Sequence, residues 1–284
     1  MTIVVKIGGA AIEDAATLRS CAVAVADLVR QGQRVVVVHG GGKALSRTLQ
    51  RLGIKSEFVD GLRVTSAETR DVAVMVLSGL VNKKLVAAVQ HAGVPALGLG
   101  GSDGQMFYAR KKQLPRELGF VGEIDTVNVQ WLETIWKQGG VPILASVVLG
   151  DDGEYYNVNA DEMAAACAVG CKADLLAFLT DVAGVADASG NVISALTPRR
   201  ISELAADSVI SRGMLPKLRA CTHAVRNGVK RVQILPASRS EALCVSRLTS
   251  LPKATDAIGT EITCDDNEAS YSRQGVLIEY TTAK

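Results

Sequence analysis

Short apolar runs alternate with segments of helical periodicity along almost the whole chain. The apolar runs occupy residues 2–7, 34–39, 94–99, 141–149, 173–181 and 230–236. Apolar residues recur at helical spacing over residues 14–31, 43–52, 65–93, 129–138, 160–169, 198–207, 214–227 and 238–248. Strands that are apolar at nearly every position and alternate with helices are typical of a mainly parallel sheet covered on both faces. The pattern therefore predicts an α/β fold.

Capping and turn residues add detail to this pattern. Thr65 and Glu68 have the spacing of a capping box, which predicts that a long helix begins there and ends near Gly93. Residues 102–113 and 119–127 have the composition of a β-hairpin, with turn residues at Asp103 and Gly104.

The strand and helix pattern restarts after Gly170. We therefore expect two halves, residues 1–172 and 173–284, with the boundary near residue 172. No linker rich in Pro or Ser separates them, so one sheet can continue across the boundary. Residues 265–284 are polar except for the stretch GVLIEY, and both a disordered tail and an additional edge strand are compatible with that composition.

Composition excludes several classes of protein. Apolar residues make up 48% of the 284 residues and charged residues 21%, as in ordinary globular proteins. The net charge of +2 gives no argument for nucleic acid or a membrane surface as partner. No apolar run approaches the roughly 20 residues that span a bilayer, and the first residues do not resemble a signal peptide. Six cysteines in a chain this long indicate a reduced, cytoplasmic protein rather than a disulfide scaffold.

The stretch VVVVHGGGKALS, residues 35–46, combines a buried strand, three glycines and a helix start. This arrangement places free backbone N–H groups and the positive end of a helix dipole at one point, which favours an anion. The spacing matches neither the Walker A loop nor the dinucleotide-binding fingerprint. The stretch therefore predicts either an anion-binding loop of another type or a tight turn without a ligand.

Two lysines stand in places that are unfavourable for a positive charge. Lys6 interrupts an apolar first strand and is followed by Gly8 and Gly9, although a lysine at the edge of a strand would also explain it. Lys217 lies in the first turns of a helix, where the dipole disfavours a cation unless an anion is bound nearby. Two lysines and a glycine loop indicate phosphoryl transfer stabilised by positive charge.

Further polar residues follow two of the apolar runs. Asn157, Asn159 and Asp161 precede an Ala-rich helix, where they offer more polar groups than one helix cap needs. A polar turn, residues 180–185, follows the strand in the second half. The chain has three histidines, and no Ser–His–Asp order is evident. Cys167 and Cys171 could share a metal, but buried thiols on a helix face explain them better, and we predict no metal site in the protein.

Seven motifs together resemble the N-acetylglutamate kinase family, a branch of the amino acid kinases. They are KIGGA, VVVVHGGG, DGLRVT, GFVGEI, YNVNADEMA, LTDVAGV and GMLPKL, in the family's order and spacing over about residues 2–262. DGLRVT with NVNAD is specific to this branch, whereas HGGG marks the wider superfamily. The resemblance implies an open three-layer αβα sandwich around a mainly parallel sheet.

The resemblance also implies an activity, the ATP-dependent phosphorylation of the side-chain carboxylate of N-acetyl-L-glutamate. In this reading Lys6 and Lys217 bind the transferring phosphoryl group, and Asp161 organises both lysines. The Gly41 and Gly42 amides hold the reacting carboxylate. A carboxylate with a pKa near ~4.3 is ionised at neutral pH, so the reaction needs no general base.

The resemblance places the remaining contacts in the two halves of the chain. Arg63 and Asn157 bind the other polar groups of N-acetyl-L-glutamate in the N-terminal half, which also forms the dimer. ATP, carrying Mg²⁺, binds the C-terminal half. The implied nucleotide contacts are Gly8, Gly9, Asp181, Val182, Ala183, Gly184, Val185, Ala186, Ser211, Arg212 and Gly213.

Two alternatives to this activity are considered. A kinase for N-acetyl-aminoadipate or a carrier-bound form is disfavoured because Arg63 suits a free α-carboxylate. A non-catalytic sensor of amino acids or nucleotides is disfavoured because Lys6, Asp161 and Lys217 are all retained. Arginine-inhibited members of the family carry an additional N-terminal helix that the sequence does not show, so we expect a homodimer that arginine does not inhibit.

Overall fold

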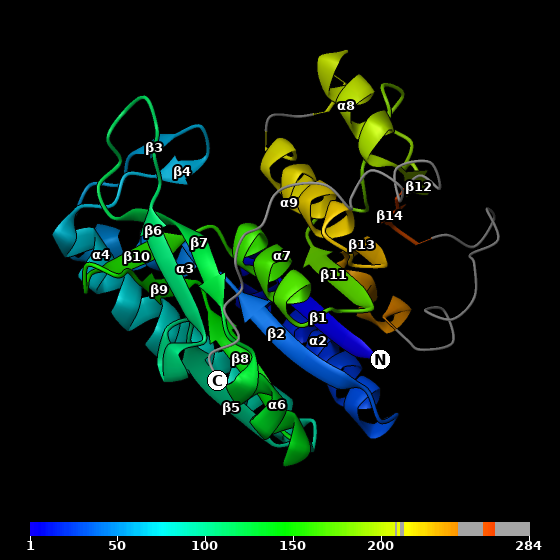
Figure 1. Ribbon diagram of the computed structural model, residues 1–284, viewed down its shortest axis with the longest axis horizontal. Coiled ribbons are helices and arrows are strands. Elements are labelled where there is room, and N and C mark those ends of the chain that lie inside the picture. Colours follow the sequence, from blue (N-terminus) through cyan, green and yellow to red (C-terminus); the bar gives the residue numbers. More distant parts are fainter. Residues whose placement is uncertain (208, 211–212, 244–257, 265–284) are drawn as a thin grey trace.

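A single eight-stranded sheet forms the centre of the molecule, with strand order β12-β14-β13-β11-β1-β2-β8-β5 (Figure 1). The computed structural model describes residues 1–207, 209–210, 213–243 and 258–264. The strands are β1 (Thr2–Ile7), β2 (Arg34–His39), β5 (Ala96–Gly100), β8 (Val141–Ala145), β11 (Leu175–Thr180), β12 (Ala195–Leu196), β13 (Arg231–Pro236) and β14 (Thr260–Ile262). Neighbouring strands are parallel except β13 and β14. The predicted α/β class is confirmed.

The central strands are apolar throughout because both of their faces are covered. Ile3 and Val5 of β1 contribute to one buried cluster, with α1 (Gly9–Glu13), α2 (Ala15–Arg30), α3 (Gly42–Arg51) and the long helix of residues 67–91. Val4 contributes to a second cluster on the opposite face, with α6 (Gln130–Lys137), α7 (Ala160–Gly170), α8 (Pro198–Ala206) and α9 (Leu215–Arg226). Alternation along each strand thus fills two cores at once.

The sheet crosses the predicted boundary near residue 172. β1 pairs on one side with β2 and on the other with β11, which begins at Leu175. The first strand of the chain therefore lies between its two halves, and its carboxyl end is shared by both. No separate linker is needed, as the composition had indicated.

A second, four-stranded sheet lies over the N-terminal half, in the order β6-β7-β10-β9. Its strands are β6 (Phe107–Lys111), β7 (Val121–Val127), β9 (Val147–Leu149) and β10 (Tyr155–Val158). The predicted hairpin of β6 and β7 is confirmed, but Asp103 and Gly104 precede β6 instead of joining the two strands. A short hairpin of β3 (Phe58–Val59) and β4 (Leu62–Arg63) projects beside it (Figure 1).

Some predicted boundaries are wrong. The run 141–149 divides into β8 and β9, which belong to different sheets. The helix after residue 65 is capped by Ser66, whose Oγ accepts a hydrogen bond from the Thr69 N–H, whereas the Thr65 hydroxyl donates to the Arg63 carbonyl. The predicted last helix is a short 3₁₀ helix, η3 (Ala237–Ala242); its remainder and the stretch GVLIEY lie outside the described residues.

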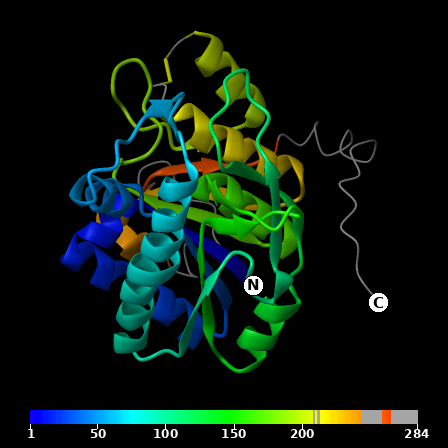
Figure 2. The same ribbon diagram turned by 90° about the vertical axis from the view of Figure 1, so that its left-hand side faces the viewer.

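The helix of residues Ala67–His91 is long and apolar enough, by length and composition, to cross a membrane. It comprises α4 (Ala67–Ala73), a π-helical segment η1 (Val74–Val81) and α5 (Asn82–His91). Val72, Leu77 and Leu85 are buried in the first core cluster, so this is a core helix of the fold. Figure 2 turns this helix toward the viewer.

Candidate active site

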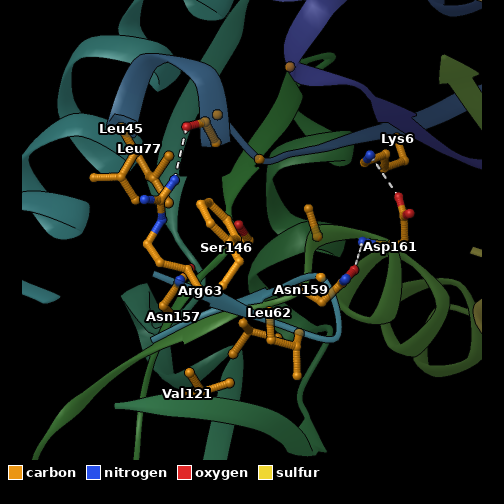
Figure 3. A pocket seen from close by; sticks show the side chains of 18 residues that line it. Lys6, Leu45, Leu62, Arg63, Leu77, Val121, Ser146, Asn157, Asn159 and Asp161 are labelled. Carbon is orange, nitrogen blue, oxygen red and sulfur yellow. Dashed lines mark hydrogen bonds and ion pairs between the residues drawn. The ribbon is translucent and has the colours of Figure 1, made fainter. Parts of the chain in front are cut away.

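One cavity of about 250 Å³ lies where the carboxyl ends of the central strands meet the helix starts (Figure 3). Open α/β sheets bind ligands at this edge. The structure brings together in the cavity wall the predicted residues Lys6, Gly9, Gly41, Gly42, Arg63, Asn157 and Asp161. They come from β1, from the starts of α1 and α3 with the Gly41 N-cap, from β4 and β10, and from α7. Figure 3 shows Lys6 and Asp161 at one side of this cavity and Arg63 at the other.

Asp161 binds two lysines from opposite halves of the chain. Lys6 Nζ lies 2.7 Å from Asp161 Oδ1, and Lys217 Nζ donates to Oδ2 at 2.9 Å. All three side chains are at most 14% exposed. Lys217 also lies 4.9 Å from the ring centroid of Phe178, a cation–π distance. One carboxylate therefore forms ion pairs with two buried ammonium groups, and the cluster keeps a net positive charge.

The pKa shifts agree with this excess of positive charge. Burial would raise the pKa of Asp161, but the charges of Lys6 and Lys217 outweigh it and lower the pKa to about 2. Burial and the charge of Lys6 lower the pKa of Lys217 in spite of Asp161. A group with multiple negative charges, such as a phosphate, would stabilise both ammonium groups here.

The cluster is positioned by the start of α7. Asn159 is the N-cap: its Oδ1 accepts from the N–H groups of Asp161 and Glu162, at 2.8 and 3.3 Å. The capping role that its position allowed is therefore confirmed. Asn157 lies two residues earlier, in β10, and lines the cavity. It donates a long hydrogen bond to Thr65 Oγ1 at 3.4 Å, so its amide remains available to a ligand.

Arg63 is a buried cation for which the described residues provide no counter-ion. It is 6% exposed, and no carboxylate of the described chain lies within ion-pair distance of it. Its guanidinium donates to Ser56 Oγ at 2.6 Å, to Ser46 Oγ at 2.7 Å and to the Gly42 carbonyl at 3.2 Å. Burial lowers its pKa. A buried unpaired guanidinium beside a cavity is suited to a carboxylate ligand.

The glycine loop approaches its neighbours most closely at Gly41. A Cβ on Gly41 would lie 2.7 Å from Leu77 Cδ2 and 3.1 Å from Val81, and one on Gly40 would lie 3.3 Å from Ala160 Cβ. Within the described chain the N–H groups of Gly41 and Gly42 have no acceptor. The loop therefore offers backbone donors to the cavity.

Of the predicted nucleotide contacts that the structure describes, Gly9 lines this cavity and the others do not. Residues 181–186 follow β11, and Val185 is buried with its N–H donated to Thr260 Oγ1 at 2.8 Å. Gly8 lies against the Leu179 carbonyl, where a Cβ would come within 3.1 Å. Gly213 directly precedes the first turn of α9, and Ser211 and Arg212 lie outside the described residues.

Sequence reasoning missed several residues of the site. Ser46 and Ser56 orient Arg63, and Ser146, just after β8, lines the cavity. Only Ser46 had a local signal, since it lies four residues after Gly42 on the same helix face. Ser56 and Ser146 reach the site through the tertiary fold, which no short motif encodes.

Comparison with known proteins shows close relatives. The profile of the amino acid kinase family matches residues 1–236. The chain is 58% identical to an acetylglutamate kinase from Acidobacterium capsulatum, covering 88% of this chain and 97% of the relative. It is 53% identical to an acetylglutamate kinase from Koribacter versatilis, covering 92% and 98%. The crystal structure of smu.665 from Streptococcus mutans UA159 superposes with a TM-score of 0.78 at 30% identity, covering 93% and 99% of the two chains.

Asp161 makes the stability of the protein depend on pH in acid. Its pKa of about 2 in the folded protein lies below its ordinary value of about 4, so its contribution is complete above pH 4 and is lost as pH falls toward 2. Over that interval wild type should lose about 2–3 kcal/mol more free energy of unfolding than Asp161→Asn. Denaturant titrations at several pH values measure this. Other carboxylates cancel in the comparison, and identical pH dependence of both proteins would contradict the assignment.

Proposed function

The chain belongs to the amino acid kinase family, among the acetylglutamate kinases, and from this premise we propose how its residues transfer a phosphoryl group. The reaction moves the γ-phosphoryl group of ATP to the side-chain carboxylate of N-acetyl-L-glutamate, a step of arginine biosynthesis. The products are N-acetyl-L-glutamyl 5-phosphate and ADP. The observation that supports this mechanism best is the bridge of Asp161 between Lys6 and Lys217 beside the glycine loop.

The substrate carboxylate attacks phosphorus directly. It is ionised at neutral pH, so no base has to remove a proton. The obstacle is the approach of one anion to another. The Gly41 and Gly42 N–H groups bind the attacking carboxylate, and Lys6 and Lys217 stabilise the charge on the phosphoryl oxygens in the transition state.

The rest of the acceptor binds across the cavity in the N-terminal half, residues 1–172. Arg63 pairs with the α-carboxylate, because its fork of donors matches a carboxylate and it has no counter-ion among the described residues. Asn157 binds another polar group of the substrate. The distance across the cavity then selects the length of the side chain between the two carboxylates.

ATP binds in the C-terminal half, residues 173–284. Its polar contacts are residues 181–186 after β11 and residues 211–213 before α9, with Gly8 and Gly9 along the phosphates. Mg²⁺ enters with ATP as part of the substrate and neutralises phosphate charge. Among the described residues, no group of three or more His, Cys, Asp or Glu side chains suited to a metal occurs.

We place the enzyme in the cytoplasm and assign it a homodimeric state. Five described cysteines are free thiols, as expected in a reducing compartment. Met75 and Leu80 on the long helix are 62% and 65% exposed, and Leu97 on the adjacent edge strand β5 is 49% exposed. An apolar face beside an unpaired strand edge is suited to a second copy of the same chain.

Trapping the acyl phosphate tests the activity. With ATP, Mg²⁺, N-acetyl-L-glutamate and hydroxylamine, the enzyme should form the acyl hydroxamate in amounts equal to the ADP produced. N-acetyl-aminoadipate in place of N-acetyl-L-glutamate should react more slowly. ADP production that does not depend on N-acetyl-L-glutamate, or a preference for the longer substrate, would overturn the assignment.

Removal of Arg63 should raise the KM for N-acetyl-L-glutamate far more than the KM for ATP. Arg63→Ala should raise the KM for N-acetyl-L-glutamate by about 10–100-fold, the worth of a charge-assisted pair, and change the KM for ATP little. Initial-rate kinetics measure both constants. Ser56→Ala removes one partner of the guanidinium but keeps its charge, and should change the acceptor KM much less. Equal effects of Arg63→Ala on both substrates would argue against this role.

Removal of either lysine should reduce turnover. Lys6→Ala and Lys217→Ala should each lower kcat on the order of 10²–10³-fold, because each removes a preorganised donor to the transferring group. Lys217→Arg should recover only part of the lost kcat, since the planar guanidinium group differs in shape from an ammonium group. Lys230→Ala is the control: Lys230 pairs with Asp174 at 2.6 Å beside the opposite ends of the strands. Wild-type turnover in Lys217→Ala would exclude the mechanism.

A charge on the apolar face should dissociate the dimer. Leu80→Glu places a carboxylate in the interface that we propose, so light scattering should report a monomer where wild type is a dimer. Val23→Glu, at a 48% exposed position of α2, is the matched control and should leave the mass unchanged. A monomeric wild type, or a dimeric Leu80→Glu, would refute the interface.

A further inference from the structure

A buried polar pair lies behind the glycine loop. His39 ends β2 directly before the three glycines, and Asn82 begins α5 where the π-helical segment η1 ends. Both side chains belong to residues that are 0% exposed. Neither lines the cavity. Buried polar side chains are costly unless their hydrogen bonds are made, so the bonds of this pair require a reason.

Two backbone carbonyls determine every proton position in the pair. Asn82 Nδ2 lies 2.9 Å from the Ile143 carbonyl, which can only accept, so the amide nitrogen must face it. The same nitrogen lies 3.0 Å from His39 Nε2 and 3.4 Å from the Leu99 carbonyl. The shorter contact gives the second N–H to His39 Nε2, which accepts it. The imidazole proton is then on Nδ1, which donates to the Gly40 carbonyl at 2.8 Å. Burial agrees, since it lowers the pKa of His39 to about 4 and keeps the ring neutral.

This chain of bonds controls the direction of one peptide. The Gly40 carbonyl and the Gly41 N–H belong to the same planar trans peptide and point in opposite directions. Because His39 holds the Gly40 carbonyl toward the buried ring, the Gly41 N–H is turned away from that ring, and Gly41 itself lines the cavity. Between two glycines the peptide would otherwise rotate easily, since neither residue has a Cβ to restrict it.

We propose that His39 and Asn82 are positioning residues that aim the Gly41 N–H at the phosphoryl acceptor. His39 acts as a fixed, neutral donor through Nδ1, and Asn82 sets its tautomer. Neither residue touches the substrate or moves a proton during the reaction. This inference rests on the proposed function, because it gives the Gly41 N–H a carboxylate to bind.

The position of Asn82 itself is tightly constrained. A Cβ on Gly98 of β5 would lie 1.9 Å from Asn82 Oδ1, so the amide is packed against bare backbone. Its Oδ1 has no hydrogen-bond partner in the described chain. The site thus tolerates an unsatisfied oxygen in order to direct both N–H groups, one toward β8 and one toward His39. A merely space-filling role would be met at lower cost by Leu.

Two amide substitutions at position 39 separate positioning from packing. The side-chain nitrogen of His39→Asn can take the place of Nδ1 and keep the bond to the Gly40 carbonyl, whereas that of His39→Gln reaches the place of Nε2. His39→Asn should therefore stay close to wild type in kcat/KM for N-acetyl-L-glutamate. His39→Gln should lose about tenfold, the worth of roughly one hydrogen bond, with the KM for ATP unchanged. Equal losses in both variants, or an equal change in the KM for ATP, would overturn the proposal.

A spectroscopic measurement keeps the test valid if a variant folds poorly. In wild-type enzyme with ¹⁵N-labelled histidine, long-range ¹H–¹⁵N correlation should show the His39 proton on Nδ1 at neutral pH. A proton on Nε2 in wild type would refute the inference, even where acyl hydroxamate forms normally. If wild type forms no hydroxamate, the proposed function fails, and the positioning role falls with it whatever the tautomer.

Discussion

The attraction of one buried carboxylate for two ammonium groups is the interaction on which the site depends. Lys6 and Lys217 both contact Asp161, so their ammonium groups repel each other. Asp161 offsets that repulsion with one carboxylate oxygen for each lysine. Because Lys6 comes from β1 and Lys217 from α9, the pairing also joins the two halves of the chain. Two ammonium groups against one carboxylate leave an excess of positive charge, and Lys6 lines the cavity. A phosphate bound there, as we propose, would complete the neutralisation.

The position of β1 makes this pairing available. It lies in the middle of the sheet, between strands from both halves, and α7 packs across it with Asp161 in its first turn. Parallel strands end at one edge, so Lys6, the glycine loop after β2 and the polar turn after β11 come together there. In the mechanism that we propose, the ionised acceptor and the nucleotide bind on either side of the lysines, as transfer between two anions requires.

The long helix behind the loop constrains the site from the other side. Leu77 and Val81 lie so close to Gly41 that a Cβ there would displace them, and the next residue, Asn82, reaches the ring of His39. Packing and hydrogen bonding in this helix therefore act on the same short loop. Its exposed side carries Met75 and Leu80, so the helix also connects the loop to the surface that we assign to the dimer.

Local patterns were sufficient where the responsible forces are local. The apolar strands, the cap at Asn159 and the free backbone N–H groups of the glycine loop follow from nearest neighbours, because strand burial, capping and turn geometry act over a few residues. The predicted helix cap was wrong by one residue because Thr65 and Ser66 are both suitable cap residues. In the structure the Thr65 hydroxyl donates to the Arg63 carbonyl in β4, and Ser66 caps the helix. The run 141–149 looked like one strand, although Ser146 marks its passage from one sheet to another.

The partners of each polar group could be known only from the folded chain. Residue types showed that Lys6, Asp161, Lys217 and Arg63 were in unusual places, and the family resemblance suggested their roles. The two-oxygen bridge, the missing counter-ion of Arg63 and the bonds of His39 depend on contacts between distant segments. Such contacts depend on the order of the strands in the sheet and on the packing of the helices against it. Burial strengthens these polar contacts only after the sheet and the helix packing have formed.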